Sequence, residues 1–144
     1  MRRIVKVVVS LVVAVVVLFG VLFTVTVSRP SAIGELTYDA ARRQVSGTGR
    51  FVVASVSQKG CLPCETMKAV TWRDPGVVEW VNAHGVGVNI DLDRDAAIAK
   101  EIDVYNAPAI IVLADGHEIA RHEGYLSAGK TLAWLETSVV AVKP

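Results

Sequence analysis

The feature that most constrains this chain is a pair of cysteines, Cys61 and Cys64, placed where an apolar segment meets a helix-like segment. Residues 51–56 are nearly all apolar, as expected of a strand that is buried on both faces of a sheet. Positions i and i+3 share one face of a helix, so the two sulfurs can reach each other. A C-x-x-C motif beside a β-α-β pattern predicts a dithiol redox centre.

The two cysteines are expected to differ in reactivity. Cys61 lies beside the free backbone N–H groups and the positive dipole end of the predicted helix, and both favour the thiolate. We therefore expect Cys61 to be the nucleophile and Cys64 to be the resolving thiol.

Two structural interpretations compete with redox chemistry. A purely structural disulfide is one alternative, although a bridge across so short a loop restricts the unfolded chain little. Structural zinc is the other, and it needs four nitrogen or sulfur ligands. The chain has no second cysteine pair, and its three histidines show no ligand spacing: His84, His117 and His122. Redox chemistry is therefore favoured, and we predict no metal site.

The N-terminus is dominated by an apolar run. Residues 7–27 are 21 residues without a charge, preceded by Arg2, Arg3 and Lys6. At about 1.5 Å per helical residue this length crosses the hydrocarbon core of a bilayer. The basic residues predict a cytoplasmic N-terminus and an exported remainder. We expect a retained membrane anchor; the alternative is a cleaved signal peptide, whose apolar core is usually only about 7–15 residues.

The length and the charge of the chain limit its domain organisation and its partners. We expect an anchor over 1–28, a linker over 29–34 and one domain over 35–144. Without the three N-terminal basic residues, 12 basic and 14 acidic residues remain, a net charge of −2. No basic block is present, so we predict no nucleic-acid partner. An exported compartment permits disulfides.

The pattern along 35–144 predicts an α/β domain. Asp74 and Pro75 are typical of a helix start, and Asp115-Gly116 is a strong hairpin signal. We expect helices over 36–45, 65–70, 75–84, 93–103 and from Ser127 through 131–135, and strands over 51–56, 86–92, 108–113 and 118–123. Two β-α-β crossovers, a hairpin and a closing helix predict a mixed four-stranded sheet with helices on both faces.

A series of motifs carries a resemblance to a known family. They are Cys61-Leu62-Pro63-Cys64, Trp72-Arg73-Asp74-Pro75-Gly76-Val77, Val88-Asn89-Ile90-Asp91, Asn106-Ala107-Pro108, Asp115-Gly116 and Gly124-Tyr125. In this order and spacing, residues 35–144 resemble the thioredoxin superfamily, and most closely the C-terminal periplasmic domain of DsbD-type thiol:disulfide interchange reductases. The resemblance implies a thioredoxin-like fold with Pro108 as a cis-proline facing the cysteine pair.

The chain departs from that family at three positions near the cysteines. Thioredoxins carry tryptophan where this chain has Gly60, and a buried aspartate where it has Ser55. A serine does not accept a proton at neutral pH, so deprotonation of Cys64 has to run through water or another group. Glu65 stands where a basic residue often follows the pair.

Several other residues are interpreted as structural. Trp72, Trp80 and Trp134 fall on apolar helix faces and are expected to pack. Asp91 and Asp93 are expected to cap a strand-to-helix turn rather than to bind a metal. Lys59 is expected to face solvent.

The sequence as a whole predicts a thiol-disulfide oxidoreductase anchored in the bacterial inner membrane with its domain in the periplasm. Cys61 and Cys64 are the predicted catalytic pair, and Leu62, Pro63, Ala107 and Pro108 are the predicted substrate-binding residues. No cofactor is expected beyond the Cys61–Cys64 disulfide.

The expected partners are exported proteins with disulfides, a membrane electron donor of thiol type and the lipid bilayer. Reduction is the favoured direction, and an oxidase or isomerase stays open. The alternative from another class is a non-enzymatic copper(I)-binding module, because soft sulfur ligands suit that ion.

Overall fold

The computed structural model describes residues 2–27 and 30–140, with the side chains of the first helix described over 6–21. Residues 28–29 of the expected anchor and linker, and residues 141–144 of the expected domain, lie outside the described part. The chain divides into two compact units, Met1–Pro30 and Ser31–Pro144.

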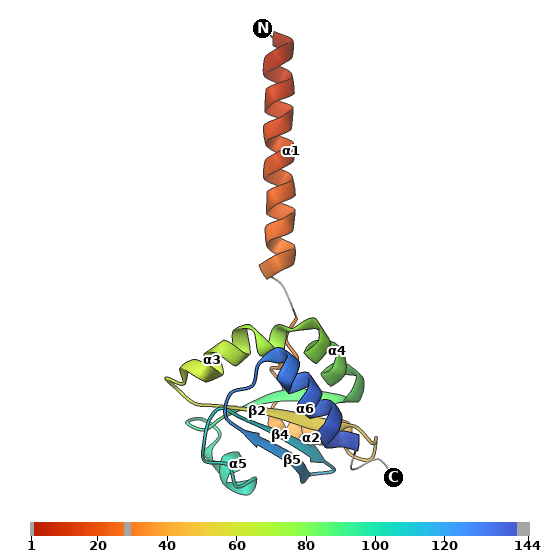
Figure 1. The fold of residues 1–144 in the computed structure, drawn as a ribbon, viewed down its shortest axis with the longest axis vertical. Helices are drawn as coiled ribbons and strands as arrows, with labels where there is room; N and C mark the ends of the chain where they lie inside the picture. Colours follow the sequence, from red (N-terminus) through yellow and green to blue (C-terminus); the bar gives the residue numbers. More distant parts are fainter. Residues whose placement is uncertain (1, 28–29, 141–144) are drawn as a thin grey trace. The chain divides into compact units, whose positions relative to one another are not determined.

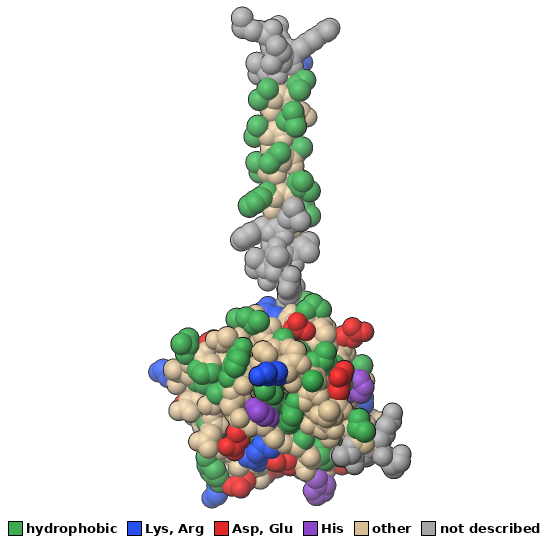
Figure 2. Space-filling view, in the orientation of Figure 1, with side chains coloured by type: hydrophobic (Ala, Val, Ile, Leu, Met, Phe, Trp, Pro, Cys, Tyr) green, Lys and Arg blue, Asp and Glu red, His purple; other side chains and the backbone are tan. Residues whose placement is uncertain are grey.

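The first unit is the helix α1 (Arg2–Val27), which covers the expected anchor segment. Its described apolar side chains are exposed, from 53% at Val8 to 71% at Phe19, and Figure 2 shows them along the helix. Within the described residues, no helix meets the combined requirement of length and apolarity for crossing a membrane.

The second unit is built on a mixed sheet with the strand order β1-β3-β2-β4-β5 (Figure 1). The strands are β1 (Ile33–Gly34), β2 (Phe51–Ser57), β3 (Gly85–Asp91), β4 (Ala109–Ala114) and β5 (His117–Glu123). Strands β1, β3 and β2 run parallel, β4 pairs antiparallel with β2, and β5 pairs antiparallel with β4. The expectation of four strands was wrong. Strand β1 is the fifth, and its two residues are too few to show the alternation by which a strand is recognised.

Helices cover both faces of the sheet, as expected. They are α2 (Tyr38–Val45), α3 (Leu62–Ala69), the short 3₁₀ helix η1 (Thr71–Arg73), α4 (Pro75–His84), α5 (Ala96–Glu101) and α6 (Ala128–Val140). Helices α2 and α5 pack on one face through Tyr38, Ala41 and Ala99. Helices α3, α4 and α6 pack on the other, where Met67 and Leu135 are buried. Each face therefore has its own apolar core.

Local signals explain where the helices begin. The Asp74 carboxylate accepts hydrogen bonds from the N–H groups of Gly76 and Val77, which confirms it as the N-cap of α4. Helix α5 is shorter than the expected 93–103. The chain leaves β3 through a turn and starts the helix only at Ala96, and Asp103 beyond its end has a left-handed φ of 52°.

The register of β2 decides which segments meet at the end of the sheet. Ser57 pairs with Asp91 of parallel β3, and Val56 pairs with Ala109 of antiparallel β4. The C-terminal ends of β2 and β3 and the N-terminal start of β4 therefore lie at one edge. The loops that leave β2 and β3 and the loop that enters β4 come together there.

Gly87 provides a test of the unexpected strand. A Cβ atom at this position would overlap the backbone oxygen of Ala32, next to β1. We expect Gly87→Ala to lower the free energy of unfolding by about 2 kcal/mol, because backbone atoms on both strands have to move apart. Urea denaturation followed by tryptophan fluorescence measures this.

The matched control is Gly129→Ala in α6, where a Cβ meets nothing within 4 Å. The same chemical change there should be neutral or should stabilise by about 0.5 kcal/mol, because alanine favours the helix. An equal effect of the two substitutions would contradict the close approach of β1 to β3.

Candidate functional site

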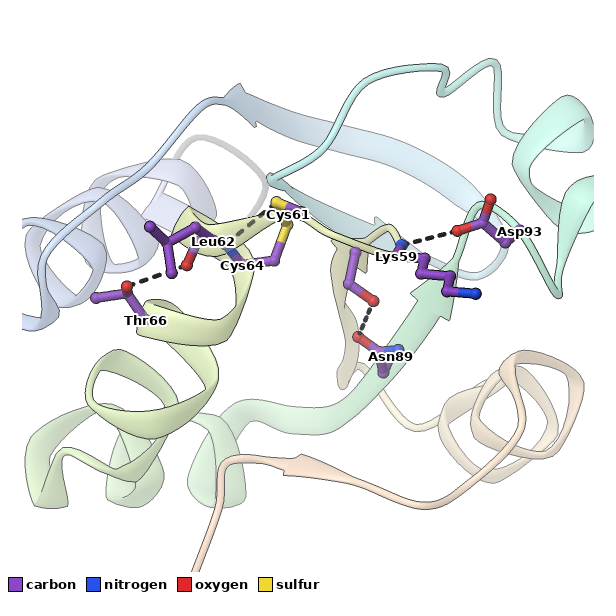
Figure 3. Close-up of a disulfide and its surroundings, with 8 residues drawn as sticks. Lys59, Cys61, Leu62, Cys64, Thr66, Asn89 and Asp93 are labelled. Carbon is purple, nitrogen blue, oxygen red and sulfur yellow. Dashed lines mark hydrogen bonds between the residues drawn. A yellow bond between two sulfur atoms is a disulfide. The ribbon is translucent and has the colours of Figure 1, made fainter.

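The site is a disulfide between Cys61 and Cys64 at the start of α3. The two Cα atoms are 5.3 Å apart, and Cys61 is the N-cap residue of the helix. The Cys64 N–H donates to the Cys61 Sγ at 3.2 Å, as Figure 3 shows. Pro63 lies in the first turn, where its missing N–H costs no hydrogen bond. The expected placement of both sulfurs at a helix N-terminus is confirmed.

The two cysteines differ in burial. Cys61 is half-buried, whereas only 6% of Cys64 is exposed. Between them, Leu62 is 76% exposed and Pro63 is exposed as well. An incoming sulfur can therefore approach Cys61 past an apolar rim, while Cys64 is covered by the domain.

The loop 58–60 presents Cys61 to solvent and is held by backbone contacts with its neighbours. Its last residue, Gly60, has a left-handed φ of 77°, which glycine adopts without strain. The Cys61 N–H donates to the Gln58 carbonyl at 3.2 Å. The Lys59 N–H donates to Oδ2 of Asp93 at 2.7 Å, a contact that the sequence did not predict.

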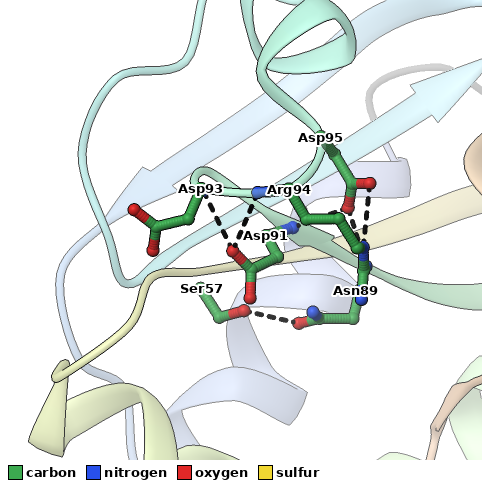
Figure 4. Close-up of polar contacts among 6 residues, drawn as sticks. All are labelled: Ser57, Asn89, Asp91, Asp93, Arg94 and Asp95. Carbon is green, nitrogen blue, oxygen red and sulfur yellow. Dashed lines mark hydrogen bonds and ion pairs between the residues drawn. The ribbon is translucent and has the colours of Figure 1, made fainter.

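The turn after β3 carries three carboxylates, and Figure 4 shows the partners of two of them, Asp91 and Asp95. Oδ1 of Asp91 accepts from the N–H of Asp93 at 2.9 Å and so caps the turn, as expected, whereas the expectation was wrong for Asp93, and the N-cap residue of α5 is Asp95. Oδ2 of Asp95 accepts from the Asp91 N–H at 2.9 Å and from Nη2 of Arg94 at 2.8 Å. The hydrogen bonds from Arg94 hold the pKa of Asp95 below its usual value, against a smaller opposing effect of burial.

In the described part of the chain, no three histidine, cysteine or carboxylate side chains form a group that could hold a metal ion. The copper(I) hypothesis therefore depends on the two sulfurs alone.

The loop that enters β4 contains the expected cis bond, between Ala107 and Pro108. Pro108 is buried, and its carbonyl accepts from the Gly124 N–H at 2.8 Å. Because Ala109 pairs with Val56, this loop lies at the same edge of the sheet as the end of β2. The backbone of Ala107 and Pro108 thus belongs to the same corner of the domain as the disulfide.

Polar groups occupy the end of β2 on the α3 side of the sheet. Ser55 is 8% exposed and alternates with Val53, which belongs to the core under α3, α4 and α6. Oγ of Ser57 donates to Oδ1 of Asn89 at 3.0 Å. The sequence identified Ser55 but missed the Ser57–Asn89 pair, which becomes visible only once the register of β2 against β3 is known.

The charged residues beside the cysteine pair and the three tryptophans differ in burial. Lys59 is exposed, as expected, and Glu65 is exposed as well. Trp72 and Trp80 are buried in the core, and Trp134 is half-buried against it. These tryptophans therefore pack, as expected.

Residues 38–138 match the thioredoxin-like domain family. A search of curated proteins gives no match.

Solved structures share the fold at low sequence identity. A thioredoxin from Thermus thermophilus superposes with a TM-score of 0.66 at 23% identity, over 76% of this chain and 88% of that chain. A DsbH oxidoreductase gives 0.67 at 10% identity, over 78% and 88% of the two chains. A putative disulphide-isomerase from Bacteroides thetaiotaomicron gives 0.65 at 20% identity, over 77% and 94%.

The Asp95–Arg94 pair predicts a pH-dependent contribution to stability. The folded state lowers the pKa of Asp95, so its stabilising effect is complete above the unfolded-state pKa and is lost as the pH falls through the folded-state pKa. We expect the stability difference between wild type and Asp95→Asn to be constant from neutral pH to about pH 5 and to shrink between about pH 4 and pH 2. Urea denaturation across this range measures it, and a difference that stays constant to pH 2 would contradict the pairing.

Proposed function

Because the chain belongs to the thioredoxin-like domain family, we propose that it is a thiol-disulfide oxidoreductase whose working pair is Cys61 and Cys64. The observation that carries this proposal is the unequal burial of two disulfide-bonded cysteines at a helix N-terminus. A structural disulfide needs no accessible sulfur, whereas disulfide exchange needs one sulfur that a substrate can reach and a second one close behind it.

The proposed reaction begins with the reduced pair. The Cys61 thiolate attacks one sulfur of a substrate disulfide, the substrate S–S bond breaks, and the released substrate thiolate takes up a proton. Cys64 then loses its proton to solvent and attacks Sγ of Cys61, which breaks the mixed disulfide and frees the second substrate thiol. The substrate gains two electrons and two protons, and the protein is left with its Cys61–Cys64 disulfide.

We propose that the four residues flanking the sulfurs bind the substrate. The exposed Leu62 and Pro63 offer an apolar surface beside Cys61. Half-buried Ala107 offers its backbone at this edge of the sheet to an extended substrate chain, whereas Pro108, which is buried and whose carbonyl is bonded to the Gly124 N–H, offers only apolar contact. The mixed disulfide formed by Cys61 is the complex in which these contacts can be examined.

Reduction of substrates is the proposed direction. The proline within the cysteine pair and the resemblance to DsbD-type reductases support it. The proposed cycle then needs a thiol-type electron donor at the membrane, because the oxidised pair has to be reduced again. Equilibration with glutathione buffers tests the direction: a reduction potential near about −120 mV, typical of strong oxidants, would overturn it.

We further propose that α1 anchors the chain in the bacterial inner membrane with the domain in the periplasm. The support comes from the uncharged run 7–27, the three basic residues before it and the exposed apolar side chains of α1. Exported proteins with disulfides are then the proposed substrates. Alkaline extraction of membranes tests this placement, since release of the full chain into the soluble fraction would contradict it.

The catalytic roles predict different outcomes for the two cysteines. Cys61→Ser should lose all reduction of insulin above background, because the accessible nucleophile is gone. Cys64→Ala should still attack once and then accumulate as a mixed disulfide, which mass spectrometry detects as an adduct on Cys61. Wild-type turnover by Cys61→Ser would exclude the proposed function.

A further inference from the structure

We propose that Asp93 is a positioning residue for Cys61, because its carboxylate fixes the loop that presents the reactive sulfur. The Lys59 N–H donates to Oδ2 of Asp93 at 2.7 Å, and Lys59 lies two residues before Cys61 (Figure 3). The contact joins two loops that are 34 residues apart in the sequence. The importance of Asp93 for turnover rests on the proposed function, whereas its effect on the reactivity of the sulfur does not.

The loop 58–60 depends on hydrogen bonds because its own side chains are not buried. Gln58, Lys59 and Gly60 are all exposed. The loop begins where the Leu92 N–H donates to the Ser57 carbonyl at 2.9 Å, which extends the pairing of β2 with β3 by one step. Beyond that point, the bond to Asp93 ties the middle of the loop to the body of the domain.

Asp93 is itself held in a defined place. Its N–H donates to Oδ1 of Asp91 at 2.9 Å, and the Asp91 N–H donates to Oδ2 of Asp95 at 2.9 Å. Asp91 is also the last residue of β3 and pairs with Ser57. The carboxylate of Asp93 therefore projects from a turn that is bonded to itself and to the sheet, which makes it a firm support for the opposite loop.

Two effects of Asp93 on Cys61 are conceivable, and they have opposite signs. By holding the loop, Asp93 keeps Sγ of Cys61 at the N-terminus of α3, where the Cys64 N–H donates to it at 3.2 Å and helix N–H groups favour a thiolate. By its negative charge, the same carboxylate disfavours a neighbouring thiolate. We infer that the first effect is the larger one, because the carboxylate contacts the loop directly and its charge is exposed to screening solvent.

The test uses the reduced full chain carrying Cys64→Ala, so that Cys61 is the only thiol, and measures its alkylation by iodoacetamide at fixed pH. Asp93→Ala removes the acceptor and the charge, and Asp93→Asn removes only the charge. We expect Asp93→Ala to react about fivefold more slowly, the factor that corresponds to one net hydrogen bond, and Asp93→Asn to stay within about twofold of the parent. Faster alkylation in both variants, or an unchanged rate in Asp93→Ala, would overturn the proposal.

Asp115→Ala is the matched control. Oδ1 of Asp115 accepts from the Gly47 N–H at 3.0 Å, so the same kind of carboxylate-to-loop bond is lost at the other end of the strands. We expect this variant to be less stable but to alkylate at the parent rate, whereas equal slowing in both alanine variants would show general loosening and overturn a specific role for Asp93. Alkylation needs no disulfide substrate, so a protein without reductase activity would contradict the proposed function and still give a result here.

Discussion

The register of strand β2 is the constraint on which the rest of this domain depends. Pairing of Ser57 with Asp91 and of Val56 with Ala109 brings the ends of three strands to one edge. A shift of β2 by one residue would turn each of its side chains to the opposite face of the sheet. Each apolar side chain would then point into the core on the other side. The correct register therefore brings together three segments that are distant in the sequence. They are the loop 58–60 before Cys61, the turn after β3 with its carboxylates, and the loop that enters β4 through the cis bond.

The chemical difference between the two sulfurs follows from their positions on one helix. Cys61 is the N-cap and is half-buried, whereas Cys64 lies in the first turn and is buried, as is Met67 three residues further along the helix. One bond thus joins an accessible atom to a covered one. This difference in burial suits the two roles proposed for the cysteines. Cys61 is the one that a substrate can reach, and Cys64 is the one that resolves the mixed disulfide.

The sequence predicts this fold well where the signal is local, and less well where it is not. The nearly all-apolar β2, the apolar β4, the Asp74-Pro75 start of α4 and the Asp115-Gly116 hairpin were all recognisable, and they placed the cysteine pair correctly. Strand β1 was missed because two residues show no alternation, and because its close approach to β3 at Gly87 is a tertiary contact. The bond between Asp93 and Lys59 was missed because two loops meet only through the tertiary register.

The two borders of the sheet affect how copies of this domain behave toward each other. On one border, β1 has only two residues; on the other, β5 carries His117, Glu118, Arg121, His122 and Glu123. A long, flat, apolar border strand would invite intermolecular β-pairing, and short or charged strands discourage it. Both borders of this sheet therefore disfavour strand-to-strand pairing between copies of the domain.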